Sequence, residues 1–113
     1  ISKKMKDTIM LYHGGKSDDV ASLRYGAIDR SRAFFCTPHI SLAQEAARSH
    51  RPMGDVLKIP VPSDVYNRCL EDGSFEEKPY LGMIQIEGCN EVIIRGEKGI
   101  SILQEILEGI YGY

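Results

Sequence analysis

The sequence predicts a single α+β domain, and three observations lead to this fold class. The chain has 113 residues, enough for one modest hydrophobic core but not for two. Short β-rich and helical patterns alternate along it in the order β-α-β-α-β-α-β-β-α, with two β runs in succession near the end. The sequence has no glycine-rich phosphate loop of the GxGxxG or GxxxxGKS/T type, which disfavours a parallel nucleotide-binding sheet.

The first half of the chain contains two predicted strands, each followed by a helix. Thr8 to His13 is β-rich and ends at a Gly-Gly pair, and Ser17 to Gly26 begins with helix-capping residues and ends at glycine. Arg32 to Pro38 is typical of a short buried strand that a proline ends. The Ala-rich helix after it is predicted to begin at Ser41, which forms a capping box with Gln44.

The second half continues with a strand, a helix and a loop. Residues 55–62 alternate as a half-exposed or edge strand does. Residues 63–73 have the capping serine and the final glycine of a short helix. Residues 74–80, "SFEEKPY", are predicted to form a polar loop.

The last third is predicted to form a hairpin and a helix. Residues 81–88 and 90–96 are two β runs joined across Gly88 and Cys89. The apolar residues after them recur at helical spacing and predict one face of a terminal amphipathic helix, formed by Ile100, Leu103, Ile106, Leu107 and Ile110.

Charge and hydropathy exclude several functions. The net charge is −2, and the 14 Lys and Arg residues are scattered apart from "KKMK" at residues 3–6, so a broad nucleic-acid surface is not indicated. Residues 1–7 are expected to be an N-terminal tail and residues 8–113 a single domain. No apolar run approaches the ~20 residues that span a bilayer, so we expect no membrane partner and a cytoplasmic protein, with secretion as an effector left open.

The cysteine pattern points to a reducing compartment. The number is odd and no CxxC pair occurs, which disfavours both a disulfide framework and a zinc knuckle, so the thiols are expected to be small core residues: Cys36, Cys69 and Cys89. His39 and His50 lack metal-ligand spacing, and we expect no metal. A thiol protease built on Cys36 and His39 is disfavoured, because the two lie three residues apart across a proline with no orienting Asp or Asn.

Three short stretches remain as candidates for chemistry. "LYHGG" places His13 beside glycines, which allow a ligand to approach the backbone closely. "AFFCTPH" contains two adjacent aromatic residues, of which Phe34 is expected in the core and Phe35 toward a ligand. "CNEVIIRG" places Glu91 at the start of an otherwise apolar strand. An imidazole, an aromatic wall and one carboxylate suit a ring-bearing, polyhydroxylated ligand.

In this order, the three stretches resemble the signature of the ADP-ribosyltransferase superfamily, in its branch of diphtheria toxin and the poly(ADP-ribose) polymerases. The similar segments are Leu11 to Gly14, Ala33 to Phe35 with the Ala-rich helix after it, and Asn90 to Ile94. The resemblance covers residues 8–107. It implies a split β-sheet core with flanking short helices, in a compact bacterial-type and toxin-like member, with NAD in the cleft between the sheets.

The resemblance also implies a role for each site residue. His13 hydrogen-bonds a ribose hydroxyl of NAD, and the backbone of Gly14 binds the nicotinamide carboxamide. Phe35 replaces the family's tyrosine as a stacking wall, and Glu91 is the catalytic acid. Tyr12 and Ser41 complete the expected NAD-binding set.

The implied activity is NAD-dependent mono-ADP-ribosyl transfer to an acceptor that the sequence does not identify, whether protein, nucleic acid or small molecule. Cleavage of the nicotinamide–ribose bond develops positive charge on the sugar, as in glycoside hydrolysis. A carboxylate bonded to the ribose 2′-hydroxyl stabilises this charge more in the transition state than in the ground state, which is the role expected of Glu91.

The chain also departs from the family pattern. Ala46 stands where a second aromatic residue usually sandwiches nicotinamide, Ala33 replaces a glycine, and Cys89 replaces the Glu or Gln of the arginine-modifying branch. Three alternatives therefore stay open: an NAD glycohydrolase, a catalytically degenerate domain that binds NAD, ADP-ribose or a protein, and a plain α+β interaction domain. In the last, His13 caps a strand end and Glu91 is a solvated hairpin acid.

Overall fold

The protein is an α+β domain in which helices and strands alternate as predicted, except that the seventh element lies earlier in the chain than the strand predicted at 81–88. The structure, a computed structural model, describes residues 7–112. Within this range the elements are β1 (Thr8–Lys16), α1 (Ser17–Leu23), β2 (Phe34–Cys36), α2 (Ile40–Arg48), β3 (Gly54–Pro62), α3 (Ser63–Asp72), β4 (Phe75–Pro79), β5 (Asn90–Ile94) and α4 (Gly96–Tyr111). The first strand runs three residues beyond the predicted end at His13. The basic cluster predicted at residues 3–6 lies outside the described residues.

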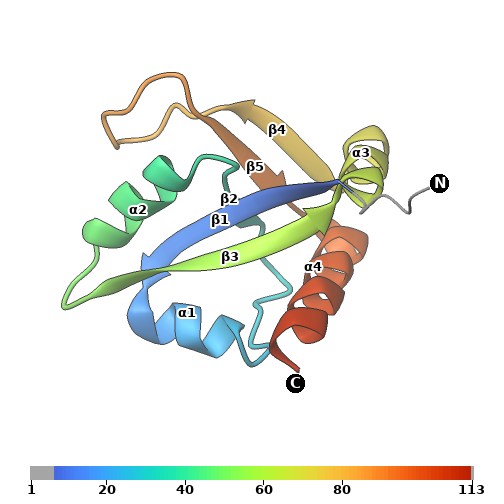
Figure 1. The fold of residues 1–113 in the computed structure, drawn as a ribbon, viewed down its shortest axis with the longest axis horizontal. Coiled ribbons are helices and arrows are strands. Elements are labelled where there is room, and N and C mark those ends of the chain that lie inside the picture. The colour runs from blue at the N-terminus through green and yellow to red at the C-terminus, as the bar shows by residue number, and fades with distance from the viewer. Residues whose placement is uncertain (1–6, 113) are drawn as a thin grey trace.

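The strands form two small antiparallel sheets. β1 pairs with β3 over its whole length, from Thr8 opposite Pro62 to Lys16 opposite Gly54. The second sheet has the order β2-β5-β4. Tyr12 and Thr37 form an isolated bridge between the sheets and exchange two backbone hydrogen bonds of 2.7 and 2.9 Å. In Figure 1 the long β1–β3 pair crosses the molecule, and β4 and β5 lie to one side of it.

One hydrophobic core is shared by both sheets and the helices. Phe34 and Cys36 point into it from β2, as expected for a strand that alternates between core and solvent. The three cysteines are buried and free. The largest fully buried side chains come from five different elements and are Leu11, Leu57, Ile59, Phe75, Ile94, Ile100, Leu103 and Leu107. The predicted inner face of α4 is thus confirmed at its centre, whereas Ile110 near its end is exposed.

Helix α2 lies directly on the β1–β3 pair because two glycines leave room for it. A Cβ atom at Gly14 would lie 2.0 Å from the carbonyl oxygen of Ala43, and one at Gly54 would lie 1.8 Å from that of Ala47. Both distances are far below van der Waals contact, so any side chain at either position would displace the helix. The glycine at position 14 is therefore required by helix packing, a constraint that local sequence does not reveal.

The predicted hairpin is wrong in its first strand. Residues 81–88 form an irregular segment, and the partner of β5 is instead β4, in the stretch predicted as a polar loop. Phe75 anchors β4 in the core, and the two carboxylates of this edge strand, Glu76 and Glu77, have hydrogen-bond partners. Glu77 accepts hydrogen bonds from the Tyr66 hydroxyl and the Asn90 amide, at 2.6 and 3.0 Å. Charged side chains on an edge strand also discourage pairing with another chain.

The predicted capping box of α2 is also wrong. The helix begins at Ile40, one residue earlier than expected, with His39 as N-cap and no side-chain cap bond. The hydroxyl of Thr37 instead accepts a hydrogen bond of 3.0 Å from the His39 N–H. Thr37 therefore orders the turn into the helix, and Ser41 lies exposed in its first turn.

The N-terminal end of the described chain is tied to the fold. The carbonyl of Asp7, which the sequence analysis placed in a tail, accepts a backbone hydrogen bond of 2.9 Å from Ser63. Between residues 7 and 112, none of the helices has the length and apolar character needed to cross a bilayer.

Candidate functional site

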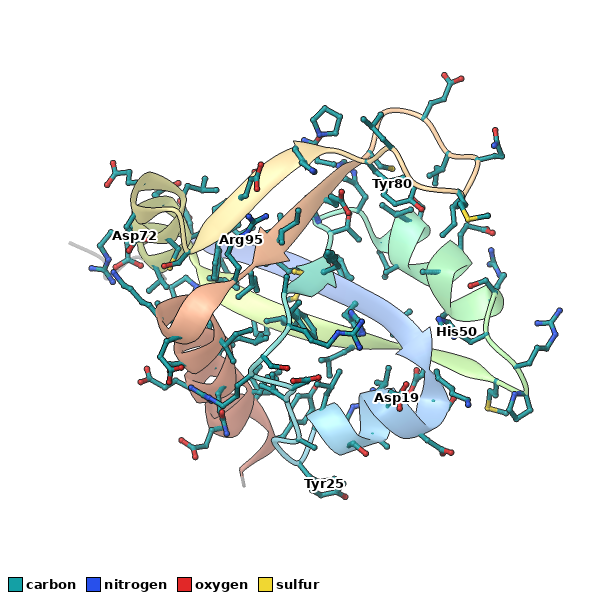
Figure 2. The ribbon with its side chains drawn as sticks, turned by 180° about the vertical axis from the view of Figure 1, so that it is seen from behind. Asp19, Tyr25, His50, Asp72, Tyr80 and Arg95 are labelled. Atoms are coloured by element: carbon teal, nitrogen blue, oxygen red, sulfur yellow. The ribbon has the colours of Figure 1, made fainter. Side chains whose placement is uncertain are left out.

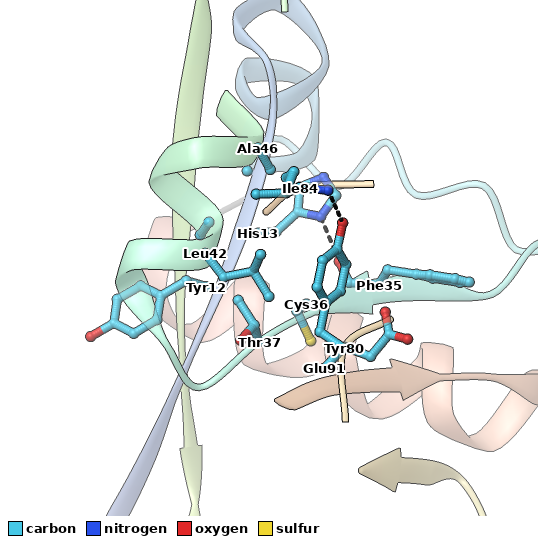
Figure 3. A pocket seen from close by; sticks show the side chains of 12 residues that line it. Tyr12, His13, Phe35, Cys36, Thr37, Leu42, Ala46, Tyr80, Ile84 and Glu91 are labelled. Carbon is cyan, nitrogen blue, oxygen red and sulfur yellow. Dashed lines mark hydrogen bonds between the residues drawn. The ribbon is translucent and has the colours of Figure 1, made fainter. Parts of the chain in front are cut away.

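A small cavity lies where β1, β2, β5 and α2 meet beneath the segment that joins β4 to β5. We call it the inner cavity; its volume is about 150 Å³, and the residues that line it include Tyr12, His13, Gly14, Phe35, Tyr80 and Glu91. Cavities of about this size accommodate a single benzene ring. Figure 3 shows side chains converging on it from both sheets and from α2. The structure thus brings together His13, Phe35 and Glu91, which are far apart in the sequence.

The imidazole of His13 is held in one orientation by two contacts. Its Nδ1 atom lies 2.7 Å from the carbonyl oxygen of Phe35, and its ring stacks on Phe34 with the centroids 4.5 Å apart. Because a carbonyl oxygen only accepts, Nδ1 carries the hydrogen, and in the neutral ring Nε2 is left as an acceptor. The bond therefore sets the tautomer needed to receive a hydrogen bond from a ligand hydroxyl.

Burial lowers the pKa of His13 below its ordinary value of 6.5. The hydrogen bond to Phe35 and the carboxylate of Asp19 act in the opposite direction, and the nearby His50 adds to the lowering. Desolvation is the largest of these effects and disfavours the charged ring. At neutral pH the side chain is accordingly the uncharged imidazole, with Nε2 as an acceptor.

The backbone of Gly14 faces the same cavity. Since Tyr12 exchanges both of its backbone hydrogen bonds with Thr37, its N–H and C=O point away from β3. In an antiparallel pair this orientation repeats at every second residue, so the N–H and C=O of Gly14 also point away from β3, and Gly14 lines the inner cavity. A donor and an acceptor side by side on one residue match the two polar groups of an amide.

Strand pairing explains why Phe35 and Glu91 share a face. Phe35 lies opposite Ile93 in the β2–β5 pair, and Glu91 precedes Ile93 by two residues, so all three side chains leave the sheet on the same side. Phe35 is 48% exposed and lines the inner cavity, whereas its neighbour Phe34 is buried as expected. Glu91 is half-buried on the cavity wall, and Glu87, four residues earlier, is exposed.

The remaining predicted residues divide into two groups. Tyr12 and Ala46 line the inner cavity. Ala46, which stands where the resemblance would place a second aromatic residue, therefore does face the site. Ser41 does not line it. Among residues 7–112 no group of three or more His, Cys, Asp and Glu side chains is arranged to hold a metal ion.

Several residues of the cavity were not predicted from the sequence. Tyr80 and Ile84 reach it from the segment between β4 and β5, which was predicted to be part loop and part strand. Leu42 and Ala43 form the side provided by α2. A signal for Tyr80 was present, since Pro79 before it and Gly82 after it mark a turn rather than a continuous strand.

Cys36 also lines the cavity, but its environment disfavours the reactive form of its thiol. Burial raises the pKa of this thiol far above its usual range, and Sγ lies 3.5 Å from the carbonyl oxygen of Val92. The reactive form of a cysteine is the thiolate, which this environment suppresses. Together with the sequence spacing, this argues against a thiol protease.

A second, larger cavity adjoins the first. We call it the outer cavity; it has a volume of about 560 Å³ and shares His13 and Phe35 with the inner one. Its polar lining includes Asp19, Asp29 and Arg32, from α1 and the segment after it. The carboxylate of Asp29 is engaged locally, because it accepts bonds of 3.0 and 2.6 Å from the N–H and hydroxyl of Ser31. A ligand with two parts can therefore extend from one cavity to the other past His13.

Comparisons of the chain with models of known protein families, with curated proteins and with solved structures found no match. What the site can do is therefore inferred from its own residues and their geometry.

Proposed function

We propose that this protein is an NAD-dependent ADP-ribosyltransferase that cleaves the bond between nicotinamide and ribose. The observation that carries the proposal is the convergence of His13, Phe35 and Glu91 on one cavity the size of a single ring. Two small sheets joined by the Tyr12–Thr37 bridge support the split-sheet core that the sequence resemblance implies. His13 comes from one sheet and Glu91 from the other, so the cavity lies at their junction.

In the proposed complex, the nicotinamide ring occupies the inner cavity against Phe35. The N–H and C=O of Gly14 bind its carboxamide, which orients the ring. The Nε2 atom of His13 accepts a hydrogen bond from a ribose hydroxyl. Glu91 accepts one from the 2′-hydroxyl and stabilises the positive charge that develops on the sugar as the bond breaks.

The atoms balance without a metal or a redox partner. The carbon–nitrogen bond breaks with its electron pair moving to the ring nitrogen, so nicotinamide leaves uncharged. The acceptor then forms a bond to the same ribose carbon and loses a proton. If water is the acceptor, the product is ADP-ribose and the protein acts as an NAD glycohydrolase.

The outer cavity suits the ADP half of the same molecule. It begins at His13 and Phe35, where the ribose would lie, and its volume is in the range of sites for ligands of several rings. Arg32 on its wall supplies a guanidinium, a group that binds phosphate oxygens in pairs. NAD would then span both cavities, with its reacting bond beside His13.

The test is release of nicotinamide from NAD by the wild type, Glu91→Gln and Glu91→Ala. Loss of a preorganised charge-stabilising group typically costs on the order of 100-fold or more in rate, and we expect this for both variants. Glu87→Gln removes an exposed carboxylate four residues away and serves as the matched control. Equal rates in the wild type and both Glu91 variants, or no release by any of them, would contradict the proposal.

A second candidate is a non-catalytic domain that binds NAD or ADP-ribose. Ala46 favours it, because this residue faces the cavity where a second aromatic wall is expected. Calorimetric titration with NAD, run beside the turnover assay, separates the two functions. Binding without turnover supports the second candidate, and turnover lost on changing Glu91 excludes it.

A further inference from the structure

The segment between β4 and β5 is organised around Tyr80. The N–H of Tyr80 donates to the carbonyl of Cys89 at 2.9 Å, which closes the base of the segment. The N–H of Ile84 donates to the Tyr80 hydroxyl at 3.2 Å, so the chain folds back over the ring. A Cβ atom on Gly82 would lie 2.2 Å from the same hydroxyl, and glycine therefore allows the close passage.

This arrangement brings the aromatic ring of Tyr80 to the inner cavity. The ring comes from the segment between β4 and β5, outside the three sequence stretches that predicted the site. Tyr80 and Ile84 line the cavity together with Ala43 and Ala46 of α2. The two alanines are small and leave the α2 side of the cavity without an aromatic ring. Figures 1 and 2 show the segment reaching from the end of β4 toward α2.

We propose that Tyr80 is the second aromatic wall of the nicotinamide site, opposite or beside Phe35, in place of the aromatic residue missing at Ala46. The inference rests on the proposed function. An electron-rich phenol ring attracts the positively charged pyridinium of NAD through its π face, and attracts uncharged nicotinamide less. Tyr80 is thus a positioning residue that favours binding of the substrate over binding of the released product.

The first experiment measures the affinity of the purified protein for NAD and for free nicotinamide by calorimetry, and KM and kcat for nicotinamide release. We expect Tyr80→Ala to weaken NAD binding and to raise KM by about tenfold, with a smaller change in nicotinamide affinity and in kcat. Tyr80→Phe keeps the ring and should recover most of the loss. Tyr25→Ala is the matched control, because Tyr25 is 79% exposed and lies far from Tyr80 in Figure 2.

A second variant and a spectroscopic signal show whether Tyr80 contacts the nicotinamide ring or only supports the fold. Gly82→Ala leaves Tyr80 in the chain but displaces its ring, and should raise KM in the same direction. In the wild type, the ring protons of bound nicotinamide should shift upfield and show nuclear Overhauser effects to the Tyr80 ring. Circular dichroism of each variant verifies the fold.

The outcomes distinguish this inference from the proposed function. If the wild type cleaves NAD in a manner that depends on Glu91, but Tyr80→Ala keeps the wild-type NAD affinity, only the assignment of Tyr80 is overturned. Absence of Overhauser effects to Tyr80 in a complex that shows them to Phe35 overturns it as well. If the wild type binds neither NAD nor nicotinamide, both proposals fall.

Discussion

The Nδ1 atom of His13 lies 2.7 Å from the backbone carbonyl oxygen of Phe35, so a side-chain hydrogen bond joins the two sheets at the candidate site, beside the backbone bridge between Tyr12 and Thr37. His13 belongs to the β1–β3 sheet and Phe35 to the β2-β5-β4 sheet. The same bond determines which ring nitrogen of His13 carries the hydrogen. The tautomer of the proposed ribose-binding group is thus a consequence of how the sheets are joined.

The first prediction concerns the protonation of His13. Nitrogen NMR should find a neutral ring at pH 7 with hydrogen on Nδ1, and a pKa below 6.5, because burial disfavours the charged form. Below this pKa, Nε2 becomes a donor and turnover should fall. A measured pKa at or above 6.5 would contradict the structural account.

The same shift predicts how stability depends on pH. Well above pH 6.5 the ring is neutral in both states and contributes no pH dependence. As the pH falls below 6.5, the unfolded chain binds the proton first, so the free energy of unfolding decreases until the pH passes the lower pKa of the folded state. Urea titrations between pH 7 and 5 should show a weaker decrease for His13→Gln than for the wild type.

The second prediction concerns the contact of α2 with β1. Gly14→Ala should destabilise the protein by several kcal/mol or unfold it, because its Cβ would collide with the carbonyl of Ala43. Gly109→Ala is the matched substitution, since Gly109 lies within α4 and a Cβ there would meet nothing within 4 Å. It should stabilise the helix by about 0.5–1 kcal/mol. Thermal unfolding of both variants measures these two changes in stability. Equal changes in the two variants would contradict the packing argument.

The third prediction tests the role of Arg32 in the outer cavity independently of nicotinamide binding in the inner cavity. Arg32→Gln should raise the KM for NAD by a few-fold to about tenfold, because a charged hydrogen bond to phosphate is lost. It should leave inhibition by free nicotinamide unchanged, since nicotinamide has no phosphate. Arg68→Gln on α3 changes the net charge equally and should have no effect. An unchanged KM in Arg32→Gln would remove Arg32 from the NAD site.

The fourth prediction concerns Thr37, whose buried hydroxyl donates to the carbonyl of Asn90 at 2.6 Å and accepts from the His39 N–H. Thr37→Val preserves the shape but leaves both partners unsatisfied, so we expect a loss of about 1–3 kcal/mol. Urea denaturation should show a lower midpoint with an unchanged slope. Thr8→Val, at an exposed position of β1, should stay within about 0.5 kcal/mol of the wild type.

The order of the elements was predictable because it is determined locally. Glycines, prolines and capping residues mark the ends of most helices and strands, and apolar periodicity distinguishes the two types between them. The second strand of the predicted hairpin, expected at 90–96, is confirmed as β5 at Asn90–Ile94. Its partner was not predictable in this way, because pairing depends on contacts that are distant in sequence.

The error at β4 has a physical cause. Leu81 and Met83 resemble the inward residues of a strand, yet they are 88% and 94% exposed. β4 was overlooked because three charged residues follow Phe75, although their side chains lie along the edge of a sheet, where charges are tolerated. Phe75 alone fixes this strand in the core.

The candidate site was predictable only in part, for the same reason. His13, Phe35 and Glu91 stand in recognisable motifs, and strand alternation carries them to one place. Tyr80 comes from an irregular segment whose course is determined by its own hydrogen bonds. The spacing of apolar residues does not predict the course of such a segment. Ser41 was expected in the NAD-binding set that the resemblance implies, but it lies exposed in the first turn of α2 and does not line the inner cavity.

The division of the proposed reacting groups between two sheets has a consequence for newly made protein. The imidazole comes from the first strand and the acid from the last, so a chain cut or stalled before residue 90 carries one without the other. Under the proposed function, such fragments cleave no NAD. Under that function, Glu91 is the last of the three site residues to be synthesised, and the chain becomes able to catalyse only once residues 90–94 are present.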